Sequence, residues 1–310
     1  MKPLLLVLNP LSADSLAQIG AGLDVLYAPD AAQRAAAVAE HGARIRAVLT
    51  IGTIGLSAAE IDAMPILELV CALGVGYEGI ATDHARRRDI ALANGAGTNA
   101  DSVADHAFAL LLATLRQIPA MDRACRDGIW RDALPVPPQA ARKKLGLIGL
   151  GAIGRKIAQR GLGFDMSIGY HTRSKRDDVA HPWFEHVLGL AQWCDLLVVA
   201  TPGGPDTQHL VDGAVLEALG PQGYLVNISR GSTVDTRALA AALTSGRIAG
   251  AGLDVYESEP APPAELIGLR NVVLTPHIGG ASPEAHGDSL RNFIENASRH
   301  FAGEPLLTPI

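Results

Sequence analysis

The sequence predicts an α/β protein made of two doubly wound parallel-sheet domains, and three observations lead to this fold class. Short apolar runs alternate with helical patterns along almost the whole chain, which is typical of parallel sheets covered on both faces. At 310 residues the chain fits two domains better than a single core. The alternation is interrupted only once, at residues 94–119, where we place the change of domain.

The first series of elements runs from residue 3 to about residue 97. Its expected strands are Leu4 to Leu8, Val25 to Tyr27, Arg46 to Ile51, Leu67 to Leu73 and Ile90 to Ala93. Ala-rich or amphipathic stretches between them predict helices at Ala31 to His41, Ala58 to Ala63 and Asp83 to Arg88. A loop at 94–99 follows, and then an apolar helix from Asp101 to Gln117 that we expect Pro119 to stop.

The second series begins at Leu145. Its expected strands are Leu145 to Ile148, Met166 to Tyr170, Leu196 to Ala200, Tyr224 to Ile228, Gly250 to Asp254 and Val272 to Leu274. A closing helix is predicted from Pro283 to His300, with Ser282 as its N-cap. We expect this helix to pack back on the first domain, which would then be discontinuous, with residues 1–99 and 283–310 in one domain, 100–282 in the other, and a cleft between them.

Composition narrows the class of partner. The net charge of −6 and the sequence pI of about 5.9 give no footprint for nucleic acid or an anionic membrane surface, so a small molecule is the expected partner. Cys71, Cys125 and Cys194 lie far apart, and no zinc motif or disulfide framework can be read from them. No metal site is predicted.

The N-terminal apolar run ends at Asn9-Pro10 after five residues, too short for the apolar region of a signal peptide. No stretch approaches the roughly 20 apolar residues that a membrane helix needs. We therefore expect a soluble, cytoplasmic protein.

A glycine-rich turn joins the strand ending at Ile148 to a helix, in the pattern Gly149-Leu150-Gly151-Ala152-Ile153-Gly154. The first glycine permits the tight turn, the second lets a pyrophosphate approach the backbone, and the third allows close packing of helix on strand. The free amides at the helix start favour a bound anion. The pattern therefore predicts a dinucleotide site, with Ala152 and Ile153 among the cofactor contacts, in a Rossmann domain.

The end of the next strand decides which nicotinamide cofactor is preferred. An acidic residue there would bond the ribose of NAD, but this chain has His171-Thr172-Arg173-Ser174-Lys175-Arg176. We expect NADPH, with Arg173 as the main contact to the 2'-phosphate and Thr172 and Ser174 as hydroxyl donors, although NADH remains possible. The alternative is a solvated basic loop.

Three charged or titratable side chains follow strands of the second series. Arg230 lies where open parallel sheets place ligands, and its planar fork suits a carboxylate. His277 could give or take a proton near neutral pH. Glu259 would favour the charged imidazole, with Glu257 as the alternative carboxylate. We therefore predict that Arg230, Glu259 and His277 are the catalytic residues. Arg230 and His277 are also expected to contact the substrate.

The chain resembles the D-isomer-specific 2-hydroxyacid dehydrogenases, and within them the glyoxylate/hydroxypyruvate reductases. The resemblance rests on five segments in the family's order, namely Leu73 to Ile80, Gly149 to Gly154, Val226 to Asp235, Gly252 to Pro260 and Thr275 to Gly280. It implies a flavodoxin-like substrate domain plus a Rossmann cofactor domain, and it assigns the functional carboxylate to Glu259, immediately before Pro260.

The resemblance also implies supporting roles. The loop of Leu73, Gly74, Val75 and Gly76 would bind the substrate carboxylate through its amides, although the glycines could simply shape a turn. Asp254 would meet the nicotinamide amide, or else cap a loop. Further expected cofactor contacts are Thr201, Pro202 and Thr207 on the adenine and ribose side, with Ile228, Ser229 and Gly279.

The implied reaction is the NADPH-dependent reduction of glyoxylate to glycolate or of hydroxypyruvate to D-glycerate. Within the family, the alternative is a 2-ketogluconate reductase or another D-2-hydroxyacid dehydrogenase. From another functional class, the alternative is an NAD(H)-sensing corepressor-like binding protein. The resemblance implies a homodimer, and the Val103 to Leu115 helix and the Trp130 to Pro138 stretch are candidate contacts. Other histidines, including His106, His171 and His286, are expected to be surface or packing residues.

Overall fold

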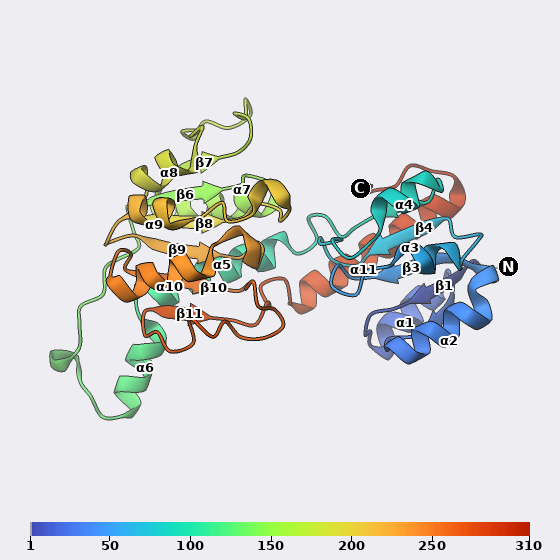
Figure 1. Ribbon diagram of the computed structural model, residues 1–310, viewed down its shortest axis with the longest axis horizontal. Coiled ribbons are helices and arrows are strands. Elements are labelled where there is room, and N and C mark those ends of the chain that lie inside the picture. Colours follow the sequence, from blue (N-terminus) through green and yellow to red (C-terminus); the bar gives the residue numbers. More distant parts are fainter. Residues whose placement is uncertain (1) are drawn as a thin grey trace. The chain divides into compact units, whose positions relative to one another are not determined.

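The computed structural model describes residues 2–310 and divides into two compact units. One consists of Met1–Asn99 together with Ala281–Ile310, and the other of Ala100–Gly280. Each unit is a parallel sheet with helices on both faces (Figure 1). The predicted fold class, two doubly wound α/β domains, is therefore confirmed.

The first unit is built on a five-stranded parallel sheet in the order β2-β1-β3-β4-β5. Register is parallel at every pair, with Leu5 opposite Val25 between β1 and β2 and Val48 opposite Val70 between β3 and β4. This is the flavodoxin-like order. The strands are β2 (Asp24–Tyr27), β1 (Leu4–Val7), β3 (Ile45–Thr50), β4 (Leu69–Ala72) and β5 (Ala91–Ala93).

Both faces of this sheet are buried because successive strand residues point to opposite sides. Leu6, with its neighbours on that face, packs against α2 (Ala31–His41), α3 (Ala58–Asp62) and α4 (Thr82–Arg87). Leu5, on the other face, packs against α1 (Ala13–Gly20) and α11 (Pro283–Ala302). The C-terminal helix α11, capped by Ser282 as predicted, thus completes the core of the N-terminal unit.

The second unit is built on a six-stranded parallel sheet in the order β11-β10-β9-β8-β6-β7. β6 has β7 on one side and β8 on the other, so the strand order reverses direction at β6. Open α/β sheets bind ligands at such a switch point. The strands are β6 (Lys144–Ile148), β7 (Ser167–His171), β8 (Leu196–Val199), β9 (Tyr224–Asn227), β10 (Gly250–Leu253) and β11 (Val272–Leu274).

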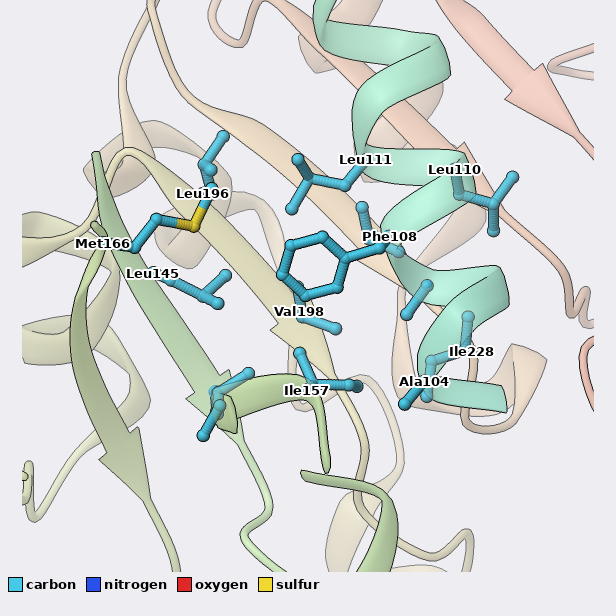
Figure 2. Packing of buried hydrophobic residues seen from close by; sticks show 14 of the residues in the cluster. Ala104, Phe108, Leu110, Leu111, Leu145, Ile157, Met166, Leu196, Val198 and Ile228 are labelled. Atoms are coloured by element: carbon cyan, nitrogen blue, oxygen red, sulfur yellow. The ribbon is translucent and has the colours of Figure 1, made fainter. Parts of the chain in front are cut away.

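Helices α5 (Ala100–Leu115) and α7 (Ala152–Gly163) cover one face of this sheet. Figure 2 shows Phe108 and Leu111 of α5 directed at Leu145 and Val198 of the strands. The other face is covered by α8 (Val187–Trp193), α9 (Gly213–Leu219) and α10 (Thr236–Ser245). Short 3₁₀ helices lie at Gly42–Arg44, Arg131–Ala133, Pro205–Thr207 and Gly231–Thr233.

The expected role of Pro119 as a stop for the preceding helix was wrong. α5 ends at Leu115, Gln117 takes a left-handed backbone conformation, and Pro119 lies in the first turn of another helix, α6 (Ile118–Arg126). A proline is tolerated there because the first-turn amides have no intrahelical acceptor. Figure 1 shows α6 and the segment after it extending away from the second sheet.

Across residues 2–310, no helix combines the length and the apolar character needed to cross a membrane.

Candidate active site

The glycine-rich turn between β6 and α7 is closely packed at two of its three glycines. Gly149 has a φ of 99°, and a Cβ there would lie 2.5 Å from the carbonyl oxygen of Ala200. A Cβ on Gly154 would lie 2.3 Å from the oxygen of Gly149. At Gly151, by contrast, a Cβ would meet nothing within 4 Å, so the turn leaves open space beside this residue.

The first turn of α7 has backbone amides that are available to bind an anion. No side chain of the described residues caps it, whereas α1, α2, α9, α10 and α11 each begin with a side-chain cap. The first-turn amides and the helix dipole therefore remain available to a phosphate. Together with the open space at Gly151 and the exposed Ala152, this fits a dinucleotide pyrophosphate. Ile153 instead packs partly against the core.

The basic side chains in the segment after β7 differ in whether they are paired with a carboxylate. Asp178 accepts from Arg155 at 2.6 Å and pairs with Arg176 at 3.3 Å, and these bonds lower the pKa of the Asp178 carboxyl. Within residues 2–310, the exposed Arg173 makes no hydrogen bond or ion pair. The Thr172 hydroxyl donates to the oxygen of Ser174 at 2.7 Å, so Thr172 shapes the turn and retains only acceptor capacity.

Most of the residues after β8 and β9 that were predicted to bind the cofactor form hydrogen bonds within the chain or are buried in its core. Thr207 Oγ1 donates to the oxygen of Pro202 at 3.0 Å, closing that loop. Ser229 Oγ donates to the oxygen of Thr201, and Ile228 is buried in the core on the α5 side. Ile228 therefore offers a ligand only its main chain.

Arg230 follows β9 on a segment held by buried polar bonds. Asn227, which is buried at the end of β9, donates to the Arg230 oxygen at 3.0 Å and accepts from the Ser229 amide. A Cβ on Gly203 would come within 2.8 Å of the Arg230 stem, and one on Gly231 within 1.9 Å of the Tyr256 backbone. The loop after β8 thus packs against the Arg230 side chain, and the loops after β9 and β10 pack closely against each other.

His277 and Glu259 form a pair. The Nδ1 atom of His277 lies 2.8 Å from Oε2 of Glu259, whose other oxygen accepts from the Tyr256 amide at 2.9 Å. Since Nδ1 is directed at the carboxylate, Nε2 is the nitrogen left to face a ligand. The side chain of His277 is 42% exposed, which gives a small molecule access to it.

The loop that carries His277 is anchored by Asp254, the buried residue that directly follows β10. This carboxylate is 3% exposed and accepts from the amides of Ile278 at 2.9 Å and Gly279 at 2.8 Å, and from Thr275 Oγ1 at 2.6 Å. Tyr256 donates its hydroxyl to the oxygen of Thr275 at 2.6 Å. Burial, with the nearby Asp254, raises the pKa of Tyr256 to about 12, so this hydroxyl keeps its proton.

Glu257, the alternative partner of His277, is engaged elsewhere. Its Oε1 lies 2.7 Å from Nε2 of His209, and its Oε2 accepts from the Thr236 amide at 3.0 Å. The hydrogen bond to Glu257 raises the pKa of His209. The geometry thus pairs His277 with Glu259.

The predicted substrate loop follows β4 in the first unit. Leu73 is buried, the oxygen of Gly74 accepts from the Gly95 amide at 2.8 Å, and the oxygen of Val75 accepts from Nδ2 of the buried Asn94 at 2.7 Å. The amides of Val75 and Gly76 donate to no acceptor among residues 2–310. Two adjacent unpaired donors are a suitable arrangement for a carboxylate.

Several polar side chains around the His277 loop were not predicted as site residues. His106 was expected to serve surface or packing roles, yet its Nε2 lies 2.8 Å from Thr275 Oγ1. Ser102 and Tyr256 also contact the loop, and Thr275 is part of it. Their positions on α5 and after β10 carry no motif, although the i, i+4 spacing of Ser102 and His106 on an apolar helix marks a shared polar face. Among the described residues, no group of His, Cys, Asp or Glu is arranged to hold a metal ion.

Comparison with known proteins places the chain in one family. The model of the D-isomer specific 2-hydroxyacid dehydrogenase NAD binding domain matches residues 108–279. A hydroxyphenylpyruvate reductase from Plectranthus scutellarioides is 40% identical over 86% of this chain and 85% of its own length. Glyoxylate/hydroxypyruvate reductase A from Arabidopsis thaliana is 41% identical over 87% of both.

Comparison with a solved structure supports the same family assignment. The NADPH-dependent glyoxylate/hydroxypyruvate reductase from Sinorhizobium meliloti, in complex with NADP and malonate, aligns with a TM-score of 0.91 and 36% identity, covering 100% of this chain and 97% of that one. The chain therefore belongs to the D-isomer-specific 2-hydroxyacid dehydrogenases, which are NAD(P)-dependent oxidoreductases.

Proposed function

We propose that this enzyme reduces small 2-oxo acids with NADPH, converting glyoxylate to glycolate and hydroxypyruvate to D-glycerate. The observation that carries the proposal is the His277–Glu259 pair, with its 2.8 Å contact at Nδ1, because it leaves an imidazole nitrogen available for proton transfer. The assignment of glyoxylate and hydroxypyruvate is supported by the Arabidopsis and Sinorhizobium relatives, which carry those substrates in their names.

When bound, NADPH supplies the hydride that C2 of the 2-oxo acid receives. Arg230 would hold the substrate carboxylate with its planar fork. Nε2 of His277 would give a proton to the carbonyl oxygen as that oxygen gains charge, and Glu259 would stabilise the imidazolium before the transfer. The reduction thus adds one hydride to C2 and one proton to the carbonyl oxygen, which becomes the hydroxyl group of the product.

The preference for NADPH is supported by Arg173. This arginine is exposed and unengaged in the described chain, while Arg155 and Arg176 pair with Asp178. A guanidinium at the strand end suits a 2'-phosphate. We assign the pyrophosphate to the amides at the start of α7, with the turn from Gly149 to Gly154, and the nicotinamide side to Asp254 and Gly279.

The substrate assignment extends to the loop of Leu73 to Gly76, whose unpaired Val75 and Gly76 amides support a role in binding the substrate carboxylate. We accordingly propose that the unit containing residues 1–99 contributes these amides to substrate binding, and that the unit containing residues 100–280 binds the cofactor and supplies Arg230 and His277.

The test is a steady-state measurement of kcat/KM with glyoxylate, hydroxypyruvate, hydroxyphenylpyruvate and 2-ketogluconate, each with NADPH and NADH. We expect the highest values with the two small acids and NADPH. A preference for 2-ketogluconate or for the aromatic acid would replace the substrate assignment, and no turnover of any of them would overturn the enzymatic proposal for these acids.

The proton donor is tested separately. His277→Ala should lower kcat for carbonyl reduction by roughly 10²-fold or more, as expected when a general acid is lost. An unchanged kcat would place the acid elsewhere.

We also propose a cytoplasmic homodimer. Its support in the structure is the segment after α6, where Trp130 is 68% exposed and Val136 is 96% exposed. The other candidate contact, the Val103 to Leu115 helix, buries most of its apolar residues inside its own unit. The dimer contact is therefore assigned to the Trp130 to Pro138 stretch alone.

A further inference from the structure

Two polar side chains on one face of α5 contact the loop of residues 275–279 near its two ends. Ser102 Oγ donates to the oxygen of Gly279 at 2.8 Å, and His106 Nε2 lies 2.8 Å from Thr275 Oγ1. Positions 102 and 106 are one helical turn apart and so face the same way. His277 lies between the two contacts.

The hydrogen-bond pattern around Asp254 settles which atom donates at His106. Asp254 Oδ1 accepts from the Ile278 amide, and Oδ2 from the Gly279 amide, so the carboxylate acts as an acceptor. Thr275 Oγ1, 2.6 Å from Oδ1, therefore gives its only proton to Asp254. Toward His106 this hydroxyl can only accept, and Nε2 of His106 must carry the proton.

A second oxygen lies near that proton. His106 Nε2 is 3.3 Å from Asp254 Oδ1, so the carboxylate attracts the ring N–H in addition to its hydrogen bond with Thr275. The imidazole of His106 also packs on the loop, since a Cβ on Gly279 would come within 3.2 Å of its ring. The ring is largely covered, with 18% of the side chain exposed.

Helix α5, which carries Ser102 and His106, is held in place by its buried apolar face. Ala104, which lies between Ser102 and His106 in sequence, and Phe108 both point into the core of the second unit (Figure 2). The loop itself needs support, because His277 has a φ of 54°, a left-handed conformation that non-glycine residues seldom adopt. The structure therefore places a rigid, hydrogen-bonding surface behind a strained segment.

We propose that His106 and Ser102 are positioning residues for proton transfer. They hold the 275–279 loop, His106 through Thr275 and Asp254 and Ser102 through Gly279, so that His277 keeps Nδ1 on Glu259 and Nε2 toward the substrate. This inference rests on the proposed role of His277 as the acid. The roles of Ser102 and His106 are structural support for the acid, and neither side chain takes part in the proton transfer itself.

The test compares His106→Leu, which removes the donor at similar volume, with His106→Gln, which keeps an N–H donor of similar reach. Ser102→Ala is the third variant. We expect His106→Leu to lower kcat by about 10-fold to 10²-fold, the cost of a small misplacement of reacting groups, and to change the pH profile of kcat. His106→Gln should recover most of the loss, and Ser102→Ala should show a smaller loss in the same direction.

Two readouts separate positioning from folding. The ring ¹⁵N signals of His277, identified by their absence in His277→Gln, should change in His106→Leu and return toward wild type in His106→Gln. The thermal unfolding midpoint reports the overall stability of each variant. Equal kcat losses in the two His106 variants, or a lower midpoint with an unchanged pH profile and unchanged His277 signals, would overturn the inference.

The outcome is also separable from the proposed function. If His277→Ala lowers kcat as expected while His106→Leu leaves kcat and the ring signals unchanged, only the positioning role fails. If His277→Ala retains wild-type kcat, the assignment of the acid fails and the positioning role with it.

Discussion

His277 combines a strained backbone with a directed side chain. Its φ of 54° lies in the left-handed region, a conformation that costs of the order of 1 kcal/mol or more for a non-glycine residue. Its own amide donates to the Asp254 oxygen at 2.8 Å, and the next two amides donate to the Asp254 carboxylate. The bonds to one buried residue thus stabilise the conformation that points the imidazole at Glu259.

Glu259 is expected to support His277 as the acid. In Glu259→Gln the Nδ1 side of the ring loses the carboxylate that lies 2.8 Å away and orients it, so kcat for reduction should fall by roughly 10²-fold, within the range of lost general-acid catalysis. The measurement is kcat against pH with the preferred 2-oxo acid. Glu257→Gln is the matched control, because that carboxylate pairs with His209, and its kcat should stay close to wild type. Equal losses in both variants would contradict the pairing.

Arg173 is expected to select the cofactor. Arg173→Ala should raise KM for NADPH by roughly 10-fold to 10²-fold, the value of a hydrogen-bonded charge, while KM for NADH changes little. Arg176→Ala is the control, since that side chain is paired with Asp178, and its effect should be smaller. If KM for both cofactors rose equally, the 2'-phosphate assignment would be wrong.

At the scale of elements, strands were the most predictable feature. The predicted limits of β11 match the structure, and those of β6 and β9 differ by one residue, because continuous apolar runs mark strands buried on both faces. Helix α1 (Ala13–Gly20) was not predicted. It is short, contains glycine, and relies on the Ser12 cap and on burial of Ile19 against the sheet. Such tertiary support leaves little trace in local pattern.

The candidate site also contains residues that could be predicted from the sequence and residues that could not. Arg230, Glu259 and His277 were predicted from strand-end positions and from a family motif, and the structure pairs Glu259 with His277. The hydrogen bonds of Ser102 and His106 to the 275–279 loop were not predicted, because they join residues about 170 positions apart in the sequence. Neither periodicity nor spacing reports a contact of that kind.

Glu60 ties two helices of the first unit together and should make stability depend on pH. Burial opposes ionisation of this carboxyl, but hydrogen bonds from Arg34 and Ser57 outweigh it, so the pKa of Glu60 is lowered on folding. A lowered carboxyl pKa contributes stability above the unfolded value of about 4.3, and the contribution is lost as pH falls through the folded value.

Glu60→Gln should therefore lower the free energy of unfolding by about 1 kcal/mol at pH 7, after allowance for partial exposure, and by less at pH 3. Urea unfolding at both pH values measures the difference. Glu40→Gln, at a more exposed carboxyl on α2, is the control and should have little effect at either pH. A loss at pH 3 as large as at pH 7 would show that the charge of Glu60 is not the stabilising feature.

At the scale of the whole molecule, the exposed apolar segment that follows α6 needs an explanation. α6 has no buried residue, and Ile129, Trp130 and Val136 after it are all exposed. Large exposed apolar side chains gathered in one stretch are typical of an interaction surface. The resemblance to the family makes a second copy of this chain the expected partner.

We predict that the double variant Trp130→Ser, Val136→Ser is monomeric at concentrations where the wild-type chain is a dimer, because it removes the most exposed apolar side chains of that stretch. Light scattering coupled to size exclusion, over a hundredfold range of concentration, measures the mass of each. Ile267→Ser is the matched control: Ile267 is also an exposed apolar residue of the second unit, 63% accessible, but lies outside the stretch, and its variant should remain dimeric. A wild-type chain of monomer mass throughout would refute the dimer, and a double variant with undiminished dimer mass would place the interface elsewhere.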